Sequence, residues 1–396
     1  MQVVILAASA SQRLYPFTET RAKPMLWVGG DFVLSHTLHQ LREAGVREVI
    51  LVVNHCEAEI RNHFKSGTAW GVTIRYVVQP EIKGIGHALL CCQEHLNQKP
   101  FLLIYGDLLA VGDIYSPTLG RFTESGEPVA VVTLPASSHE YGNIYFDHEM
   151  RINRLVEKPQ QGQANYVLAG IFVLPHEFLR RLEKADQDIL ECFQDHIAQG
   201  QFHAQLWEKG WMDMVHPWHI LEANKMILNQ WATASIDTSA QLRGNVRIEG
   251  AVRIEGNVVI ESGSVLKGPC LIGKGSYIGN NVLIRNHSVV GPKSLVGYGC
   301  ELKNCIAFGG NDIGRLSFLG DSVLGEGTVL GAGVTTVNRV PDNSEIICNI
   351  NGEETRTGLK KIGALIGDRA FIGARQTFRP NTTIPSGTII PDNISY

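Results

Sequence analysis

Hydrophobic and polar positions follow two different periods along this chain, and the change falls close to residue 236. Before that point, short apolar runs alternate with stretches of helical period, a pattern typical of a parallel α/β sheet. Strands are expected at residues 3–6, 48–53, 73–78, 101–105, 129–133 and 170–174. Amphipathic stretches predict a helix at residues 34–41, between the first two strands, and a last helix at residues 220–228.

From residue 236 onward, every sixth residue is aliphatic over twelve consecutive repeats. These positions are Ile236, Leu242, Ile248, Ile254, Ile260, Leu266, Ile272, Ile278, Ile284, Val290, Val296 and Leu302. A period of six predicts a parallel β-helix, whose stacked coils bury one aliphatic column per face. The period lapses at residues 309–316, resumes at Phe318, Leu324 and Leu330, and breaks again over residues 337–362. We expect both interruptions to be loops that project from the coils.

The hexapeptide pattern resembles the left-handed β-helix of hexapeptide-repeat proteins. A chain of 396 residues is also too long for one ordinary core. We therefore expect an α/β domain at residues 1–230, built on a mixed and mostly parallel sheet. A left-handed parallel β-helix is expected to follow at residues 236–396.

The composition excludes several classes of protein. A hydrophobic content of 44% with 19% charged residues is that of a soluble globular protein, and a net charge of −4 provides no basic face for nucleic acid. No apolar segment approaches the length that spans a bilayer, and the N-terminus has no leader pattern. Eight scattered cysteines without zinc-binding spacing predict reduced thiols and a cytoplasmic location.

A loop of small residues follows the first expected strand, where an open α/β sheet binds its ligands. Small residues let backbone N–H groups approach phosphates. The loop and the residues after it resemble the signature of the sugar-1-phosphate nucleotidylyltransferases, which implies a Rossmann-like nucleotidyltransferase domain. The resemblance implies that Arg13 and Lys23 are catalytic and face the triphosphate, and that the nucleotide is bound by Leu6, Ala7, Ala8, Ser9 and Ser11. Ser9 and Ser11 replace signature glycines, and their Cβ atoms disfavour a positive φ.

Transfer of a nucleotidyl group to a sugar 1-phosphate needs no general base, because the nucleophile is already an anionic phosphate. It needs positioning and charge neutralisation, which a divalent metal held by carboxylates supplies. Asp107 follows an expected strand in the sequence Tyr-Gly-Asp, and Asp213 ends the sequence Gly-Trp-Met-Asp. Both stretches resemble family motifs that carry metal-binding aspartates. The resemblance therefore implies that Asp107 and Asp213 bind Mg²⁺.

Three further motifs concern the substrates. Glu157 and Lys158, in Glu-Lys-Pro, and Gly142, in Tyr-Gly, resemble the family residues that bind the sugar 1-phosphate. Gln79 and Gly84 resemble the pair that reads a pyrimidine base in uridylyl- and thymidylyltransferases. The resemblance implies a nucleoside triphosphate and a sugar 1-phosphate as substrates, with UTP or dTTP preferred.

Some relatives with a β-helix also acetylate an amino-sugar phosphate, and residues 315–322 resemble their acetyltransferase segment. The general-base histidine of that segment is Arg315 here, and the tyrosine is Phe318. A guanidinium cannot accept a proton, so acetyl transfer is not expected. The resemblance implies instead that the β-helix assembles the chain into a trimer or a multiple of it.

Two alternatives remain open at this point. The serines of the phosphate loop are compatible with a catalytically weak protein of the same fold that binds nucleotide sugars as a regulator or scaffold. The β-helix is also compatible with a bifunctional enzyme that has an acyltransferase activity.

Overall fold

The computed structural model describes residues 1–9, 11–135, 141–156, 165–350 and 353–393. Contacts divide the chain into two compact units. The first comprises Met1–Ala10, Arg21–Met25 and Phe32–Asp213, and the second comprises Ser11–Thr20, Leu26–Asp31 and Met214–Tyr396. Among the described residues, no helix has both the length and the apolar character needed to cross a membrane.

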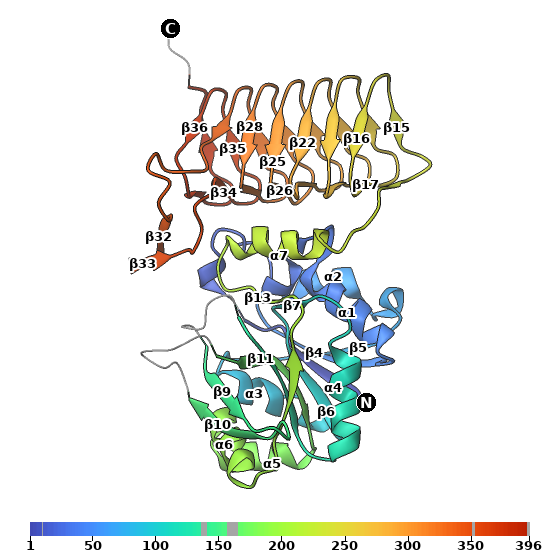
Figure 1. Ribbon diagram of the computed structural model, residues 1–396, viewed down its shortest axis with the longest axis vertical. Helices are drawn as coiled ribbons and strands as arrows, with labels where there is room; N and C mark the ends of the chain where they lie inside the picture. Colours follow the sequence, from blue (N-terminus) through green and yellow to red (C-terminus); the bar gives the residue numbers. More distant parts are fainter. Residues whose placement is uncertain (10, 136–140, 157–164, 351–352, 394–396) are drawn as a thin grey trace. The chain divides into compact units, whose positions relative to one another are not determined.

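A nine-stranded mixed sheet forms the centre of the first unit (Figure 1). The strand order is β10-β9-β11-β6-β1-β4-β5, with β8 paired to β11 and β12 paired to β8. The bounds are β1 Gln2–Leu6, β4 Glu48–Val53, β5 Thr73–Val78, β6 Phe101–Tyr105, β8 Val129–Thr133, β9 Asn143–Phe146, β10 Ile152–Val156, β11 Val167–Leu174 and β12 His203–Trp207. The four strands β6, β1, β4 and β5 are parallel, and β11 runs antiparallel to β6. All six expected strands are present.

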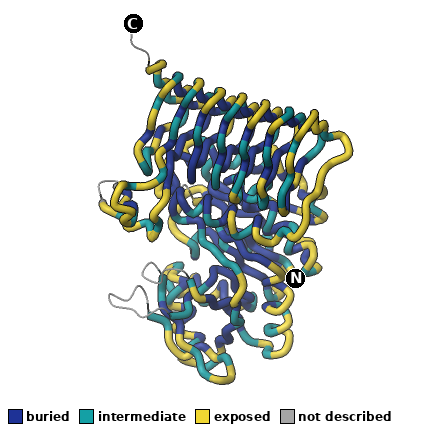
Figure 2. The backbone as a smooth tube through the Cα atoms, turned by 45° about the horizontal axis from the view of Figure 1, so that its top comes forward, coloured by how far each residue is buried: buried dark blue, intermediate teal, exposed yellow. Residues whose placement is uncertain are grey.

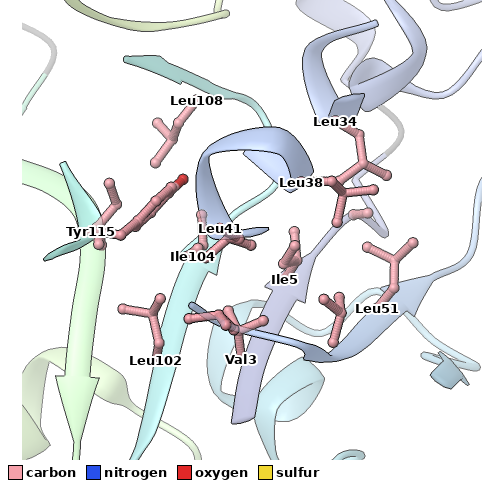
Figure 3. Packing of buried hydrophobic residues seen from close by; sticks show 14 of the residues in the cluster. Val3, Ile5, Leu34, Leu38, Leu41, Leu51, Leu102, Ile104, Leu108 and Tyr115 are labelled. Atoms are coloured by element: carbon pink, nitrogen blue, oxygen red, sulfur yellow. The ribbon is translucent and has the colours of Figure 1, made fainter. Parts of the chain in front are cut away.

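The central strands are apolar on both faces because helices cover both faces. The helices of this unit are α1 Val33–Glu43, α2 Glu57–Phe64, α3 Ile85–Leu90, α4 Tyr115–Ser125, α5 Glu177–Lys184 and α6 Ile189–Ala198. On one face, Val3 and Ile5 of β1 pack with Leu34, Leu38 and Leu41 of α1, which are spaced to lie on one side of that helix (Figure 3). Alternate residues of the same strands point to a second core on the other face. Packing on both faces of the sheet therefore fixes the positions of the ends of β1 and β6.

The second unit contains a left-handed parallel β-helix of three sheets. The sheets run from β14 (Ser235–Ile236) to β37 (Thr382–Ile384), from β15 (Gln241–Leu242) to β38 (Ile389–Ile390), and from β16 (Arg247–Glu249) to β36 (Thr377–Phe378). The expected column residues from Ile254 to Leu302 are buried inside the coils, whereas Ile236 and Leu242 of the first coil are exposed. Figure 2 shows buried residues along the stacked coils and exposed residues at their corners.

The first interruption of the period is not a projecting loop, so that expectation was wrong. β26 (Ile306–Ala307) and β27 (Asp312–Ile313) continue the coils, and Val289 pairs with Ile306 where an unbroken period would place residue 307. This coil and the one after it are each one residue shorter, since Ile306 in turn pairs with Val323, and each shortening shifts the phase of the pattern. Leu319 is therefore fully buried in the next strand, β28 (Phe318–Gly320), and Phe318, the expected column residue, is only partly buried.

The second interruption lies outside the coils, as expected. β29 (Val323–Leu324) pairs directly with β34 (Ala364–Ile366), and the chain between them includes the antiparallel pair β32 (Ile347–Ile350) and β33 (Glu353–Arg356). A small apolar cluster of Trp218, Ile346, Cys348 and Ile362 holds this interruption to the chain just before α7.

Helix α7 (His219–Leu228) belongs to the second unit. The side-chain amide of Asn224 donates a hydrogen bond of 2.6 Å to the carbonyl of His287 on a β-helix corner. The sequence pattern predicts that this helix closes the first domain. The domain ranges 1–230 and 236–396 remain predictions about which parts of the chain fold independently. All eight cysteines are free in this structure.

Candidate active site

Asp107 and Asp213 are brought together by a short antiparallel pair of strands. Asp107 lies in the turn between β6 and β7 (Leu108–Ala110), and Asp213 ends β13 (Trp211–Asp213). β7 and β13 pair so that Leu108 lies opposite Asp213. Two carboxylates that are far apart in the sequence therefore lie at the carboxyl end of a central parallel strand, where this class of sheet binds ligands.

Lys23 lies between these two carboxylates. Its ammonium Nζ is 2.5 Å from Oδ2 of Asp107 and 3.6 Å from Oδ1 of Asp213. Burial, the largest single influence, lowers the pKa of Lys23. The attraction of both aspartates and their hydrogen bonds outweigh it, so the pKa lies above the ordinary 10.5. Lys23 is therefore protonated at neutral pH and neutralises one of the two negative charges.

This arrangement fits a divalent cation held partly by the protein. Among the described residues, no group of three or more His, Cys, Asp and Glu side chains is placed to hold a metal. Two carboxylates are nevertheless the set that Mg²⁺ commonly takes from a protein when substrate phosphates and water complete its octahedron. Both aspartates keep about a quarter of their side-chain surface exposed, which leaves their oxygens accessible to a cation.

Two glycines let the backbone close around Asp107. A Cβ on Gly106 would lie 2.5 Å from the carbonyl oxygen of Leu6, so the turn after β6 can approach the end of β1 only with glycine. Gly170, at φ 73°, interrupts the register of β11, and a Cβ there would lie 2.8 Å from the ring of Tyr105. Gly170 is not among the site residues predicted from the sequence, although a glycine inside a strand is a known signal for an irregularity or a close approach.

Gln79 and Gly84 lie together, as their proposed common role requires. The Gln79 side chain is almost fully buried, and its amide nitrogen lies 3.1 Å from the Gly84 carbonyl and 3.1 Å from Nδ1 of His87. Gly84 has φ 93° and precedes α3, and a Cβ built on it would meet open space. The two contacts fix the orientation of the Gln79 amide.

The expected sugar-phosphate residues are described only in part. Tyr141, next to Gly142, packs edge-on against Trp211 with ring centroids 5.8 Å apart. The indole of Trp211 donates to the carbonyl of Ala169 at 3.1 Å, which fixes the strand that ends at Asp213. Glu157 and Lys158 lie outside the described residues.

The small-residue loop is divided between the two units. Leu6, Ala7, Ala8 and Ser9 belong to the first, and the N–H of Ala7 donates to the carbonyl of Val52 at 2.8 Å, so that group is engaged within the sheet. Ser11 belongs to the second unit with Arg13, which is exposed on the short helix η1 (Gln12–Leu14). Ser11 adopts φ 44°, the left-handed conformation in which the signature has glycine.

Comparison with known proteins indicates the same kind of site. Residues 2–230 match the family described as nucleotidyl transferase, and residues 266–392 match the GMPPB C-terminal domain. The chain is 30% identical to the "Bifunctional protein GlmU" of Methanococcus maripaludis over 99% of this chain and 94% of that protein. It is 28% identical to the "Bifunctional sugar-1-phosphate nucleotidylyltransferase/acetyltransferase" of Sulfurisphaera tokodaii over 100% of this chain and 98% of that one. A crystal structure described as a glucose-1-phosphate thymidylyltransferase from Bacillus anthracis, in complex with sucrose, matches 57% of this chain and 95% of its own. The TM-score is 0.54 at 21% identity, so this match shows the fold alone.

Proposed function

This chain belongs to the nucleotidyl transferase family, and from that premise we propose that it is a sugar-1-phosphate nucleotidylyltransferase. It converts a nucleoside triphosphate and a sugar 1-phosphate into a nucleoside diphosphate sugar and pyrophosphate. The observation that carries the proposal is the cluster of Lys23 between Asp107 and Asp213 at the carboxyl end of β6. The naming of full-length relatives as nucleotidylyltransferases supports it.

In the proposed reaction, an oxygen of the sugar 1-phosphate attacks the α-phosphorus of the nucleotide. One P–O bond forms there, the bond to the β-phosphate breaks, and pyrophosphate leaves with the electron pair. The nucleophile carries no proton that must be removed, so no general base is needed and catalysis consists of positioning and charge neutralisation. Asp107 and Asp213 are the residues that would hold Mg²⁺, which supplies charge neutralisation at the phosphates. Lys23 keeps these two carboxylates close together, and Arg13 is the second cation assigned to the triphosphate.

The same proposal identifies the nucleotide substrate as UTP or dTTP. The Gln79 amide nitrogen is occupied by Gly84 and His87, which leaves its carbonyl oxygen as the acceptor for the ring N–H of a pyrimidine. The loop from Leu6 to Ser11 is assigned to the phosphates. Gly142, Glu157 and Lys158 are assigned to the sugar 1-phosphate.

Because its full-length relatives are named bifunctional, acetyl transfer is the second activity to weigh. We propose that this chain lacks the family's acetyl transfer, since Arg315 stands where the general-base histidine is expected. Arg315 follows β27, and neither it nor Phe318 can accept the amine proton that a histidine would take. A binding protein without turnover is the remaining alternative, and it rests on Ser9 and Ser11.

We further propose that the β-helix assembles the chain into a trimer or a multiple of it. One of its three sheets carries large apolar side chains on its outer face, in two groups that the exposed Asp312 separates. Tyr277 pairs with Leu295, Phe371 pairs with Ile389, and all four side chains are more than a third exposed. Groups of large exposed apolar side chains on a flat sheet are typical of an interface between subunits.

The experiment that tests the function is release of pyrophosphate from a panel of nucleoside triphosphates and sugar 1-phosphates in the presence of Mg²⁺. The proposal expects release with UTP or dTTP that depends on both substrates. Binding of nucleotide sugar without turnover on any pair would favour the regulatory alternative.

A further inference from the structure

Two acceptors hold the side-chain nitrogen of Gln79, and one of them belongs to a residue to which the proposed reaction gives no role. The Gln79 Nε2 lies 3.1 Å from the carbonyl oxygen of Gly84 and 3.1 Å from Nδ1 of His87. A primary amide nitrogen carries two hydrogens, so these two contacts occupy its whole capacity as a donor. His87 therefore has a direct influence on how the Gln79 side chain is presented.

The two contacts fix which way the Gln79 amide points. The Gly84 carbonyl can only accept a hydrogen bond, so the group that faces it is the NH₂ group and not the oxygen. Nδ1 of His87 accepts the second hydrogen when the ring is neutral and carries its proton on Nε2. The Gln79 oxygen forms no hydrogen bond with the described residues, and it is not among their fully buried polar atoms, so a ligand can reach it.

The groups on both sides of the Gln79 side chain are themselves fixed. The backbone N–H of Gln79 donates to the carbonyl of Val53 at 2.9 Å, and the side chain of Asn54 donates to the Gln79 carbonyl at 2.6 Å. On α3, Leu89 is fully buried in the core on one face of the sheet, which fixes the turn that carries His87. The contact between Gln79 and His87 thus joins two fixed parts of the first unit.

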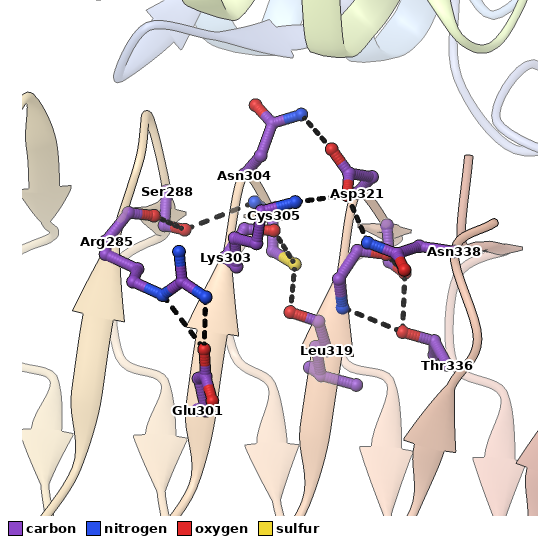
Figure 4. A network of polar contacts seen from close by, with 12 residues as sticks. Arg285, Ser288, Glu301, Lys303, Asn304, Cys305, Leu319, Asp321, Thr336 and Asn338 are labelled. Carbon is purple, nitrogen blue, oxygen red and sulfur yellow. Dashed lines mark hydrogen bonds and ion pairs between the residues drawn. The ribbon is translucent and has the colours of Figure 1, made fainter. Parts of the chain in front are cut away.

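Elsewhere in the chain, a carboxylate orients side-chain amides. In the β-helix, the nitrogens of Asn304 and Asn338 both donate to Asp321 (Figure 4). A carboxylate beside Gln79 would add a negative charge close to a nucleotide that already carries several, and like charges at close range repel each other. The neutral imidazole of His87 orients the amide without that repulsion.

We propose that His87, acting through Gln79, makes the nucleotide site select uracil or thymine over cytosine. Uracil and thymine have an N–H at ring position 3, which donates to the Gln79 oxygen, whereas cytosine has an acceptor at that position. Turning the amide over would accommodate cytosine, but it would set the Gln79 oxygen against two acceptors, Gly84 and His87. This role rests on the proposed function and adds a positioning residue to it.

The test is calorimetric titration of the full-length protein with UTP and CTP, and with dTTP and dCTP, in Mg²⁺ without a sugar 1-phosphate, so that no transfer occurs. Wild type should prefer the uracil or thymine member of the pair that it binds more tightly. His87→Leu removes the acceptor and should reduce that preference at least about tenfold, or ~1.4 kcal/mol. His87→Asn should retain the preference, because its amide oxygen can take the place of Nδ1.

The matched control is His95→Leu, which replaces another partly buried histidine of the first unit, whose Nδ1 lies 3.4 Å from the guanidinium of Arg75. It should leave the preference unchanged. An unchanged preference in His87→Leu, even with weaker binding of both nucleotides, overturns the role of His87, and so does an equal fall in the control. A wild type that binds both members of a pair equally overturns it too. A wild type that binds none of the four nucleotides contradicts the proposed function itself.

Discussion

The ring of Phe17 packs against the ring of Phe308, with centroids 5.5 Å apart, and both side chains are buried. Phe17 lies in the segment that also carries Arg13, whereas Phe308 lies in the β-helix. Two polar contacts fix the same segment to the β-helix: Thr20 donates to Asp368, and Glu19 accepts from the N–H of Ser386 at 2.8 Å. The β-helix thus anchors part of the loop that the sequence assigns to the nucleotide.

Phe308→Ala should therefore raise KM for the nucleoside triphosphate, by about tenfold, because Arg13 loses the anchor of its segment. Phe378→Ala is the matched control, since it removes a buried phenylalanine elsewhere in the same β-helix. Each truncation should lower the free energy of unfolding by about 3–5 kcal/mol. Initial rates of pyrophosphate release, measured under conditions in which both variants are folded, separate the change in KM from the loss of stability. An equal KM in the two variants would show that the anchor has no part in nucleotide binding.

Lys23→Met should reduce turnover by at least about a hundredfold, because two adjacent carboxylates then repel each other without a cation between them. The same variant reports on the raised pKa of Lys23. A group whose pKa is raised by folding stabilises the folded state fully below its unfolded pKa, near 10.5, and loses that contribution as the pH rises through the folded value.

The difference in unfolding free energy between wild type and Lys23→Met should therefore be constant from pH 7 to about 9 and shrink only above about 10.5. Denaturant unfolding at a series of pH values measures it. If the difference in unfolding free energy changes between pH 7 and 9, a titrating group other than Lys23 determines its pH dependence.

Six strands of the first unit and most strands of the coils follow from the sequence, because they lie in apolar runs or on a column of period six. β9, β10 and β12 were not among the predicted strands. The meeting of Asp107 and Asp213 could not be predicted from spacing, since it depends on the three-residue pairing of β7 with β13. Motif resemblance placed both residues at one site, but not the Lys23 ammonium between them. A local pattern cannot specify a contact made by three distant segments.

The other differences between the structure and the sequence predictions also have local causes. Leu319 rather than Phe318 lies in the buried column because two successive coils each lack one residue, and an absent residue leaves only a change of phase in the sequence. The grouping of Ser11–Thr20 with the β-helix depends on contacts such as Phe17 with Phe308, for which the sequence has no periodic signal.

Assembly is tested on the exposed apolar side chains of the β-helix. Phe371→Lys places a charge between Val329 and Ile389 and should convert the oligomer to monomer in sedimentation velocity. Thr383→Lys adds the same charge to an exposed position of another sheet and should leave the oligomer intact. A monomeric wild type, or an equal effect of both substitutions, would contradict assembly through this sheet.

The full-length protein should not transfer an acetyl group from acetyl-CoA to an amino-sugar phosphate, because Arg315 cannot accept the proton of the amine. Thiol release from acetyl-CoA in the presence of glucosamine 1-phosphate measures this activity. Acetyl transfer by wild type that disappears in Arg315→Ala would show that Arg315 takes part in catalysis.

The most direct test of the account is Mg²⁺-dependent pyrophosphate release by Asp107→Asn and Asp213→Asn, with the best nucleotide and sugar 1-phosphate found for wild type. Each substitution keeps the size of the side chain and removes one carboxylate from the cluster around Lys23. Asp195→Asn, at an exposed position on α6, is the matched control and should retain full activity. The account predicts a loss of at least about a thousandfold in both cluster variants, or ~4 kcal/mol of barrier, and no release by wild type in EDTA. Near-wild-type release by either variant, or by wild type in EDTA, would contradict it.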